Sequence, residues 1–246
     1  MSHSGVFDGE TSDGGIQGVV VGIVTDNEDP KDLGRVKLRF PWRDADDESY
    51  WARVATTMTG DGYGSYFLPD VDDEVLVAFE NGDIHTPFVV GSLWNGTQKP
   101  PQTNTEGKNE IREIRSRSDH AITFDDADEG SITIETSGGH EIRIDDSSGS
   151  ETVSISDETG DNAITLDSSG GSVSIEAAKE LDLKAPTITV DGTKKLKLSG
   201  GTAVDVSSKN KVSLSSNAQV AISSSGLMKI DSTGPMTLKG ALIQLN

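Results

Sequence analysis

The sequence predicts an all-β protein with two parts, a small barrel near the N-terminus and a long repetitive rod after it. From Leu196 to Met236, pairs of apolar residues at positions i and i+2 recur every eight residues without a slip. Such alternation indicates a strand with one buried face, and a short fixed period indicates stacked units. All three Trp, all three Tyr and four of the six Phe lie between residues 16 and 96, so this part has a conventional core.

The composition sets limits on both structure and function. Only 33% of the 246 residues are apolar, which is little for one globular core but sufficient for a narrow rod. The net charge of −20 argues against nucleic-acid binding and disfavours an anionic bilayer surface. It favours solubility, and a salt-loving source is a further possibility. There is no cysteine, which excludes disulfides and thiolate metal sites.

Residues 1–15 are polar and rich in Gly, Ser and Asp, and we expect a flexible N-terminal arm without a signal peptide. Strand-like runs follow, separated by turn-forming segments that include the hairpin signal Asn81-Gly82-Asp83. The runs are residues 16–24, 35–40, 51–55, 74–79 and 88–94. Five short strands in about 80 residues fit a small closed barrel of the OB type, and we place this domain at residues 16–96.

Four stretches of the barrel carry a family resemblance. They read DPKDLGRVKLRFPW, SYWARVAT, GYGSYFLPDVDDEVLVAFENGD and PFVVGSLWNG. In order, spacing and residue type they resemble the OB domain of the contractile-tail central spike family, which includes phage baseplate assembly protein V and the spike part of VgrG. The resemblance implies that a trimeric β-helical needle follows the barrel, so that together they cover about nine tenths of the chain.

A polar linker that contains Pro100 and Pro101 occupies residues 97–110, and the needle is expected over residues 111–246. Its first units are nine to eleven residues apart and its later ones eight. In each unit the apolar side chains are expected to face a common axis. These predicted core residues are Ile122, Phe124, Ile132, Ile134, Ile142, Ile144, Val153, Ile155, Ile164, Leu166, Val173, Ile175, Leu181, Leu183, Ile188, Val190, Leu196, Leu198, Val204, Val206, Val212, Leu214, Val220, Ile222, Met228, Ile230, Met236, Leu238, Ile243 and Leu245.

The eight-residue unit bears on the number of chains. Eight residues supply one strand and one corner, which is about one side of a triangular prism. Three chains wound together would close that prism and leave no long lateral edge. The alternative is a single-chain solenoid, which usually needs longer coils. Together with the resemblance, this favours an intertwined triple-stranded β-helix and a homotrimer.

The sequence offers little for catalysis or for metal and cofactor binding. Paired carboxylates can hydrolyse glycosides, but here they lie in repeat turns, where solvated charge is the simpler explanation. His85 is expected at the surface. His120 and His140 each precede an apolar pair by two residues, so they face either the axis, where three imidazoles might bind an ion, or solvent at a strand entrance. We therefore expect no enzyme, no catalytic residues, no metal site and no cofactor.

The expected function is that of a mechanical, membrane-puncturing spike of a contractile injection system, assembled in the cytoplasm into a phage-like tail or related particle. Only about 15 residues precede the barrel, which implies a separate hub protein at that end. A trimeric tail fibre that binds or degrades surface polysaccharide is the alternative. It would usually carry aromatic residues for sugar, and the rod has none after Phe124. A passive structural fibre is a third reading.

The chain stops directly after a predicted strand, in the sequence LKGALIQLN. In a trimer this would leave an open strand edge beside apolar side chains, and such an edge invites another chain. In the resembling family a conical tip protein docks at this blunt end. The expected tip-protein binding residues are Ala241, Leu242, Ile243, Gln244, Leu245 and Asn246.

Overall fold

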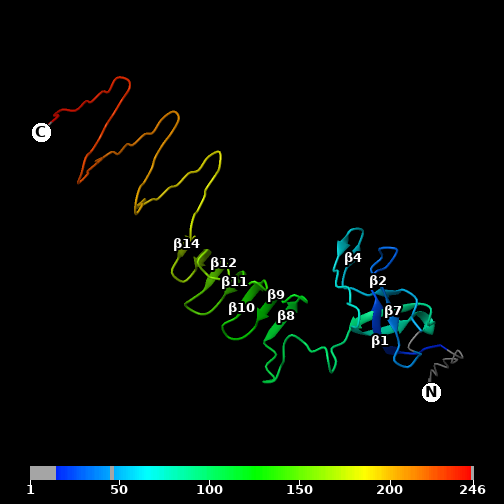
Figure 1. Ribbon diagram of the computed structural model, residues 1–246. Coiled ribbons are helices and arrows are strands. Elements are labelled where there is room, and N and C mark those ends of the chain that lie inside the picture. The colour runs from blue at the N-terminus through cyan, green and yellow to red at the C-terminus, as the bar shows by residue number, and fades with distance from the viewer. Residues whose placement is uncertain (1–14, 45–46, 245–246) are drawn as a thin grey trace, which may run out of the picture. The chain divides into compact units, whose positions relative to one another are not determined.

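The computed structural model describes residues 15–44 and 47–244 and divides the chain into two units, with the boundary after Asp182 (Figure 1). The first unit holds the barrel and a separate seven-stranded sheet, and the second holds the rest of the octad segment. Of the expected N-terminal arm, residues 1–14 lie outside the described residues.

Among the described residues, no helix has the length and apolar character needed to cross a membrane.

A closed barrel of five strands forms from the five runs that the sequence predicts. Its order is β1-β2-β3-β7-β6, with β3 and β7 parallel and the other neighbours antiparallel. The strands are β1 (Val19–Asp26), β2 (Arg35–Arg39), β3 (Ala52–Val54), β6 (Glu74–Phe79) and β7 (Pro87–Ser92). The expected all-β class and five-stranded barrel are therefore confirmed.

The barrel core follows from alternation along its strands. In β6 every second residue is buried, and the same pattern holds within β2. The largest fully buried side chains are Val24, Val36, Leu38, Val75, Val77 and Val89. Branched aliphatic side chains of this kind fill the interior of a small barrel without leaving voids.

Two short elements of the barrel were not predicted as such. A small hairpin, β4 (Thr59–Gly60) and β5 (Tyr63–Gly64), lies in the stretch expected to be a Gly-rich loop. The Tyr63 ring lies where a side chain at residue 60 would be, so a larger residue there would displace this exposed ring. The turn between β6 and β7 is a 3-10 segment, η1 (Glu80–Gly82), with φ of 51° at Asn81 and 79° at Gly82. It confirms the predicted Asn-Gly hairpin.

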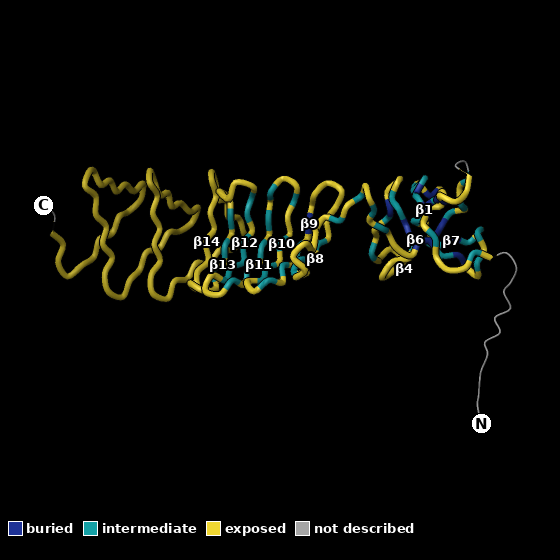
Figure 2. The backbone as a smooth tube through the Cα atoms, turned by 90° about the horizontal axis from the view of Figure 1, so that it is seen from below, coloured by how far each residue is buried: buried dark blue, intermediate teal, exposed yellow. Residues whose placement is uncertain are grey.

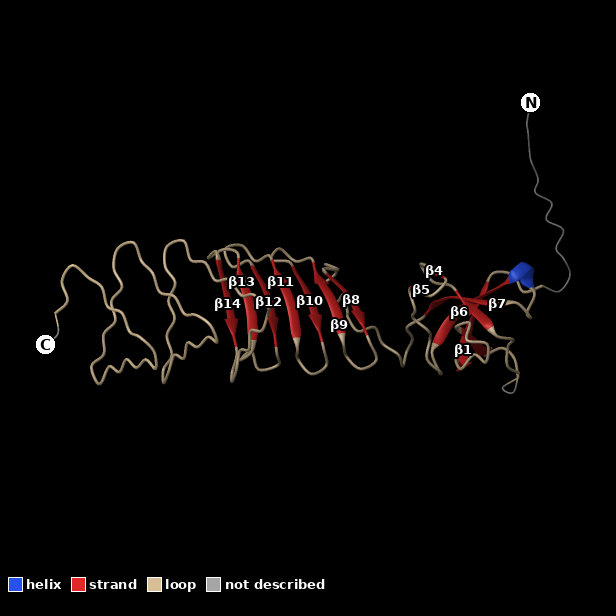
Figure 3. Cartoon of the chain, turned by 90° about the horizontal axis from the view of Figure 1, so that it is seen from above, coloured by secondary structure: helices blue, strands red, loops and turns tan. Residues whose placement is uncertain are grey.

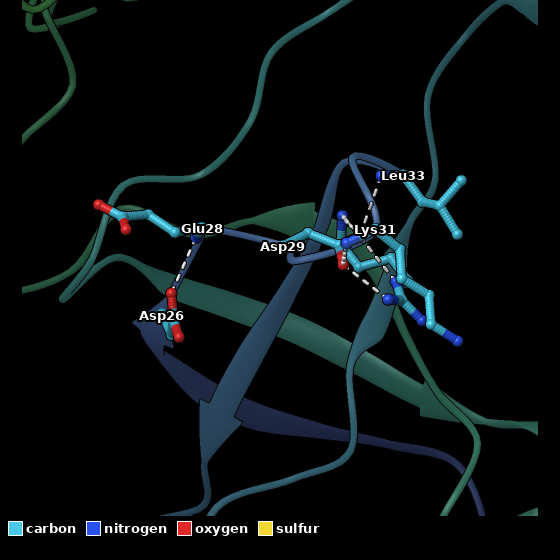
Figure 4. A network of polar contacts seen from close by, with 6 residues as sticks. Asp26, Glu28, Asp29, Lys31 and Leu33 are labelled. Atoms are coloured by element: carbon cyan, nitrogen blue, oxygen red, sulfur yellow. Dashed lines mark hydrogen bonds and ion pairs between the residues drawn. The ribbon is translucent and has the colours of Figure 1, made fainter.

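The loop between β1 and β2 is organised around one carboxylate. Asp29 is only 8% exposed. Figure 4 shows it accepting hydrogen bonds from the backbone N–H groups of Lys31 and Leu33, at 3.0 and 3.1 Å. The Arg35 side chain binds the same carboxylate. These contacts, with the Arg35 hydrogen bonds strongest, hold the pKa of Asp29 well below its usual range.

Residues 111–176 form a seven-stranded antiparallel meander (Figure 3). Its strands are β8 (Ile111–Arg115), β9 (Ala121–Asp125), β10 (Ser131–Glu135), β11 (Glu141–Asp145), β12 (Thr152–Ser156), β13 (Ala163–Asp167) and β14 (Ser172–Glu176). Each strand pairs with the next one along the chain. Residues 97–110, the expected linker, contain no strand, and the sheet begins at Ile111.

The octad segment is described from residue 177 to residue 244, and no strand is assigned in it. Several of its corners share one hydrogen bond, in which a Ser hydroxyl oxygen accepts the backbone N–H two residues on. The bonds run from Asn210 to Ser208, from Ala218 to Ser216, from Gly226 to Ser224 and from Gly234 to Ser232. The four serines are eight residues apart, so the repeat in sequence is also a repeat in local structure.

Candidate functional site

The candidate functional site is the apolar face of the β8–β14 sheet. The register places the members of the predicted apolar pairs directly opposite one another. One row across the sheet consists of Ile114, Ile122, Ile134, Ile142, Ile155, Ile164 and Ile175. A second row consists of Phe124, Ile132, Ile144, Val153, Leu166 and Val173. The two rows are separated by one residue in every strand, so they share a face.

This face is exposed in the single chain. Phe124 is 40% exposed and Leu166 is 42% exposed, and the other members of both rows are similarly or more exposed except Val153, which is half-buried. Figure 2 shows the exposed and half-buried positions alternating along the sheet. A contiguous apolar surface of this extent is unusual on a monomeric protein and marks an interaction surface.

The opposite face has a polar central row, and most of it is less exposed than the apolar face. It consists of Glu113, Thr123, Thr133, Arg143, Ser154, Thr165 and Ser174. The Arg143 guanidinium donates to the Asp145 carboxylate at 2.8 Å and to the Thr133 hydroxyl at 3.4 Å. Within one chain, side chains on the polar face form hydrogen bonds with one another, while the aliphatic face is exposed. The aliphatic face is therefore available to pack against another surface.

Acidic residues stabilise the turns of this sheet by accepting hydrogen bonds. Asp125, Asp145 and Asp167 end alternate strands, and each accepts the backbone N–H of a residue two or three positions on, at 2.6 to 3.0 Å. The carboxylates in these turns were expected to be solvated charges, and their role as hydrogen-bond acceptors that stabilise the turns was missed. The Asp-x-Ser spacing at residues 145–147 and 167–169 is the signal that could have indicated it.

Hydrogen bonds lower the pKa values of several of these carboxyl groups. The hydroxyl and the backbone N–H of Ser147, followed by Arg143, hold the pKa of Asp145 at about 2. Asp157, in the next turn, accepts from the side chains of Asn162 and Thr159, and its pKa is also about 2. Asp145 and Asp157 are therefore anionic at neutral pH and contribute to the acidic surface.

The predicted core residues of the octad segment are also exposed. Within each pair the first residue is the less exposed one, for example 54% at Leu196 against 75% at Leu198. The pairs do not meet one another through strand pairing within the described residues, in contrast to the pairs of the sheet. Their burial around an axis therefore stays a prediction.

The expected tip-binding residues are described only in part. Residues 241–244 adopt no strand, and Leu242 and Ile243 are exposed. Leu245 and Asn246 lie outside the described residues, which also applies to Leu245 as a predicted core residue.

The histidines lie in turns. His120 and His140 are exposed and precede β9 and β11, and the Nδ1 atom of His120 accepts the backbone N–H of Ser137 at 3.2 Å. His85 lies beside Asp83, with 2.8 Å between Nδ1 and the carboxylate. Within the part of the chain that the structure describes, no three His, Asp or Glu side chains are grouped as a metal site would require.

Comparison with known proteins identifies the barrel. Residues 20–94 match the type VI secretion system/phage-baseplate injector OB domain. The type VI secretion system spike protein VgrG3 of Vibrio cholerae is 37% identical over 93 residues, which are 36% of this chain and 9% of that protein. The spike protein VgrG1a of Pseudomonas aeruginosa is 33% identical over 87 residues, 34% of this chain and 14% of that protein.

A third relative has a toxin name. The actin cross-linking toxin VgrG1 of Vibrio cholerae is 38% identical over 79 residues, which are 30% of this chain and 7% of the toxin. In all three comparisons this chain covers about a tenth of the relative's length. The matched strands, their order and the closed barrel agree with one another, and the barrel is therefore similar to the OB domain of phage-baseplate and VgrG-type spike proteins.

Proposed function

We propose that the chain is the central, membrane-puncturing spike of a contractile injection system, a phage-like tail or a related particle, and that it acts as a homotrimer. The observation that carries this proposal is the two-row apolar face of the β8–β14 sheet. The similarity of the barrel to spike proteins supports this type of machine.

Three copies of the sheet can cover one another's apolar faces. Each strand is five residues long, and one apolar row crosses all seven strands while the second crosses six, from β9 to β14. Three such sheets arranged as a triangular prism would bring Ile, Leu and Val side chains together along one axis. Hydrophobic burial contributes about 25 cal/mol per Å² of apolar surface removed from water, so the gain grows with the length of the sheet. The octad segment would continue the prism as an intertwined triple-stranded β-helix.

The proposed mechanism is mechanical and requires no reaction at the spike. Sheath contraction would supply the work, and the rod would transmit force along its axis to the target envelope. Backbone hydrogen bonds along the sheet and a close-packed axis supply stiffness. The polar outer face and the net charge of −20 keep neighbouring spikes apart.

Two partners belong to this proposal. A separate hub protein would hold the barrel end, and a PAAR-type tip protein would bind residues 241–246. The exposed Leu242 and Ile243 support an attachment point at this end. The proposed location is the cytoplasm during assembly and an injection particle afterwards.

Copy number in purified particles tests the proposal and separates it from a tail fibre. Quantitative mass spectrometry with isotope-labelled peptides of the barrel should return three copies per particle. Electron microscopy with an antibody to the barrel should place the label on the particle axis. Six or more copies at the periphery, or depolymerisation of surface polysaccharide by the purified chain, would contradict a central spike.

A further inference from the structure

The segment between the barrel and the sheet contains two turns that are each closed by an asparagine. We call residues 95–110 the connector. The side-chain oxygen of Asn95 accepts the backbone N–H groups two and three residues on, at 2.8 and 2.7 Å. The side-chain oxygen of Asn104 accepts the backbone N–H of Asn109 at 2.8 Å. Asn stabilises turns in this way, so the polar residues of the connector give it a defined local structure.

The first turn of the connector is bonded to the barrel. The side-chain amide of Asn95 donates to the Glu74 carboxylate at 3.1 Å, and that of Gln98 donates to the Asp73 carboxylate at 2.9 Å. We call these two bonds the barrel latch. Asp73 belongs to the barrel framework, because its carbonyl oxygen accepts the backbone N–H of the fully buried Val24 at 3.0 Å.

The connector is also bonded to the first strand of the sheet. The side-chain amide of Gln102 donates to the carboxylate of Glu113 on β8, and we call this bond the sheet latch. The Glu113 side chain is only 2% exposed, and Arg115 donates to the same carboxylate. The hydrogen bond from Arg115, followed by that from Gln102, lowers the pKa of Glu113 against the effect of burial. The sheet latch is therefore a charge-assisted hydrogen bond to a largely buried acceptor.

The path between the two latches is short and stiff. Only Lys99, Pro100 and Pro101 separate Gln98 from Gln102. The ring of a proline fixes its φ angle, and a residue that precedes a proline is restricted to extended conformations. Lys99 and Pro100 both precede a proline, so every residue of this path is restricted.

The sheet latch also bypasses the longest loop of the connector. Residues 103–110 leave the path at Gln102 and return at the start of β8, and the bond from Gln102 to Glu113 joins the two ends of this loop. Movement within the loop therefore does not by itself separate the stiff path from β8.

We propose that the connector is a rigid coupling between the barrel and β8, rather than a flexible linker, and that Gln98 and Gln102 are its positioning residues. The coupling is a property of one chain and does not depend on the spike function. Its use does rest on the proposed function, because a rigid joint would pass force from the barrel into the needle without loss to bending.

Fluorescence anisotropy decay on the full-length chain tests the rigidity. The chain has no cysteine, so Val90→Cys supplies a single labelling site on the exposed side of β7. The label should report only the slow rotation of the whole particle, and a fast component should appear when Gln98 and Gln102 are both replaced by Ala. A fast component that corresponds to the barrel alone in the parent chain would overturn the proposal.

Hydrogen exchange tests the sheet latch separately. Gln102→Glu places a second carboxylate against Glu113 and should speed amide exchange in residues 103–113 about tenfold, the effect of losing one charge-assisted hydrogen bond. Combining it with Glu113→Gln exchanges donor and acceptor and should restore most of the protection. Thr105→Glu is the matched control, because it adds the same charge at an exposed position of the same loop and should change exchange little.

Two outcomes of these exchange measurements would overturn the role of Gln102. One is equal exchange in Gln102→Glu and the control, and the other is no recovery in the exchanged pair. Light scattering on the same samples reports the number of chains. A rigid connector in a monomer would contradict the spike and retain the coupling, whereas a mobile barrel in a trimer would do the reverse.

Discussion

Asp29 and Arg35 form a two-pronged ion pair, in which Nε donates to Oδ2 at 2.7 Å and Nη2 donates to Oδ1 at 2.6 Å. The pair closes the loop between β1 and β2 and fixes the start of β2, the strand that leads to the fully buried Val36 and Leu38. An Arg-carboxylate pair of this geometry is strong because both bonds are charge-assisted and parallel.

Replacing Asp29 by Asn should lower the melting temperature of the barrel. The amide keeps the shape but loses the charge, and its NH2 group cannot accept a bond from Arg35. Asp32→Asn in the same exposed turn is the control and should have little effect, since Asn tolerates the φ of 53° found there. Equal melting temperatures of the two variants by circular dichroism would show that the pair does not stabilise the loop.

Asp157 should make the stability of the sheet depend on pH in the acid range. Its pKa is about 2 in the folded chain against an ordinary value of 3.8, chiefly because of the side chains of Asn162 and Thr159. The stabilisation is fully present above about pH 4 and is lost as the pH falls through about 2. Asp157→Asn should therefore be less stable than the parent at pH 5 and nearly equal to it at pH 2. A stability difference that does not shrink with acid would contradict this assignment.

The effect of a substitution at Leu166 on stability distinguishes a covered apolar face of the sheet from an exposed one. If three sheets cover one another, Leu166→Ala should lower the free energy of unfolding by about 2–5 kcal/mol per chain, as for a core position. At an exposed position the same change costs only about 0.5 kcal/mol. Thr165→Ala, one residue away on the polar face, is the matched control. Urea unfolding measured at one protein concentration gives both values, and equal small losses would argue against coverage.

Truncation tests the proposed attachment of a tip protein. Deleting residues 242–246 should abolish capture of the tip protein while leaving the oligomeric state unchanged, because the sheet and most of the octad segment remain. A pull-down with the PAAR-type protein encoded beside the spike gene is the measurement. Equal retention by truncated and full-length chains would place the attachment elsewhere.

The barrel could be predicted from sequence because its signals are local. Alternation marks the strands, and Asn81-Gly82 marks a hairpin whose two residues have positive φ. The clustered aromatic residues were a poorer guide, because only Phe40 and Phe79 among those of residues 16–96 are buried and the core is mainly aliphatic. The β4–β5 hairpin was missed because its two-residue strands leave no alternation to detect. The surface pocket lined by Arg35, Trp51, Arg53 and His85 was missed because β2, β3 and the loop before β7 are brought together only by closure of the barrel.

The rod shows what periodicity can and cannot predict. The apolar pairs of residues 111–176 share a face, as the alternation indicates, but their strands form an antiparallel meander within one chain. Alternation has the same period in parallel and antiparallel pairing, so it does not reveal the strand direction. The turns reveal it better, since Gly139, Gly149, Gly160 and Gly171 have the positive φ values that reverse the chain.

The intertwined β-helix of the octad segment remains a prediction, because its ladder would depend on contacts between chains. One chain contributes an apolar pair and a Ser corner every eight residues. In the proposed trimer, the neighbouring copies would determine what packs beside each apolar pair. The sequence of one chain gives only the repeat length.

Size-exclusion chromatography with multi-angle light scattering on the full-length chain tests the central claim most directly. Three copies of the 26.0 kDa chain should elute as a single species of about 78 kDa, and the mass should not change on dilution. A species of about 26 kDa, with its apolar face open to solvent, would contradict the trimeric spike.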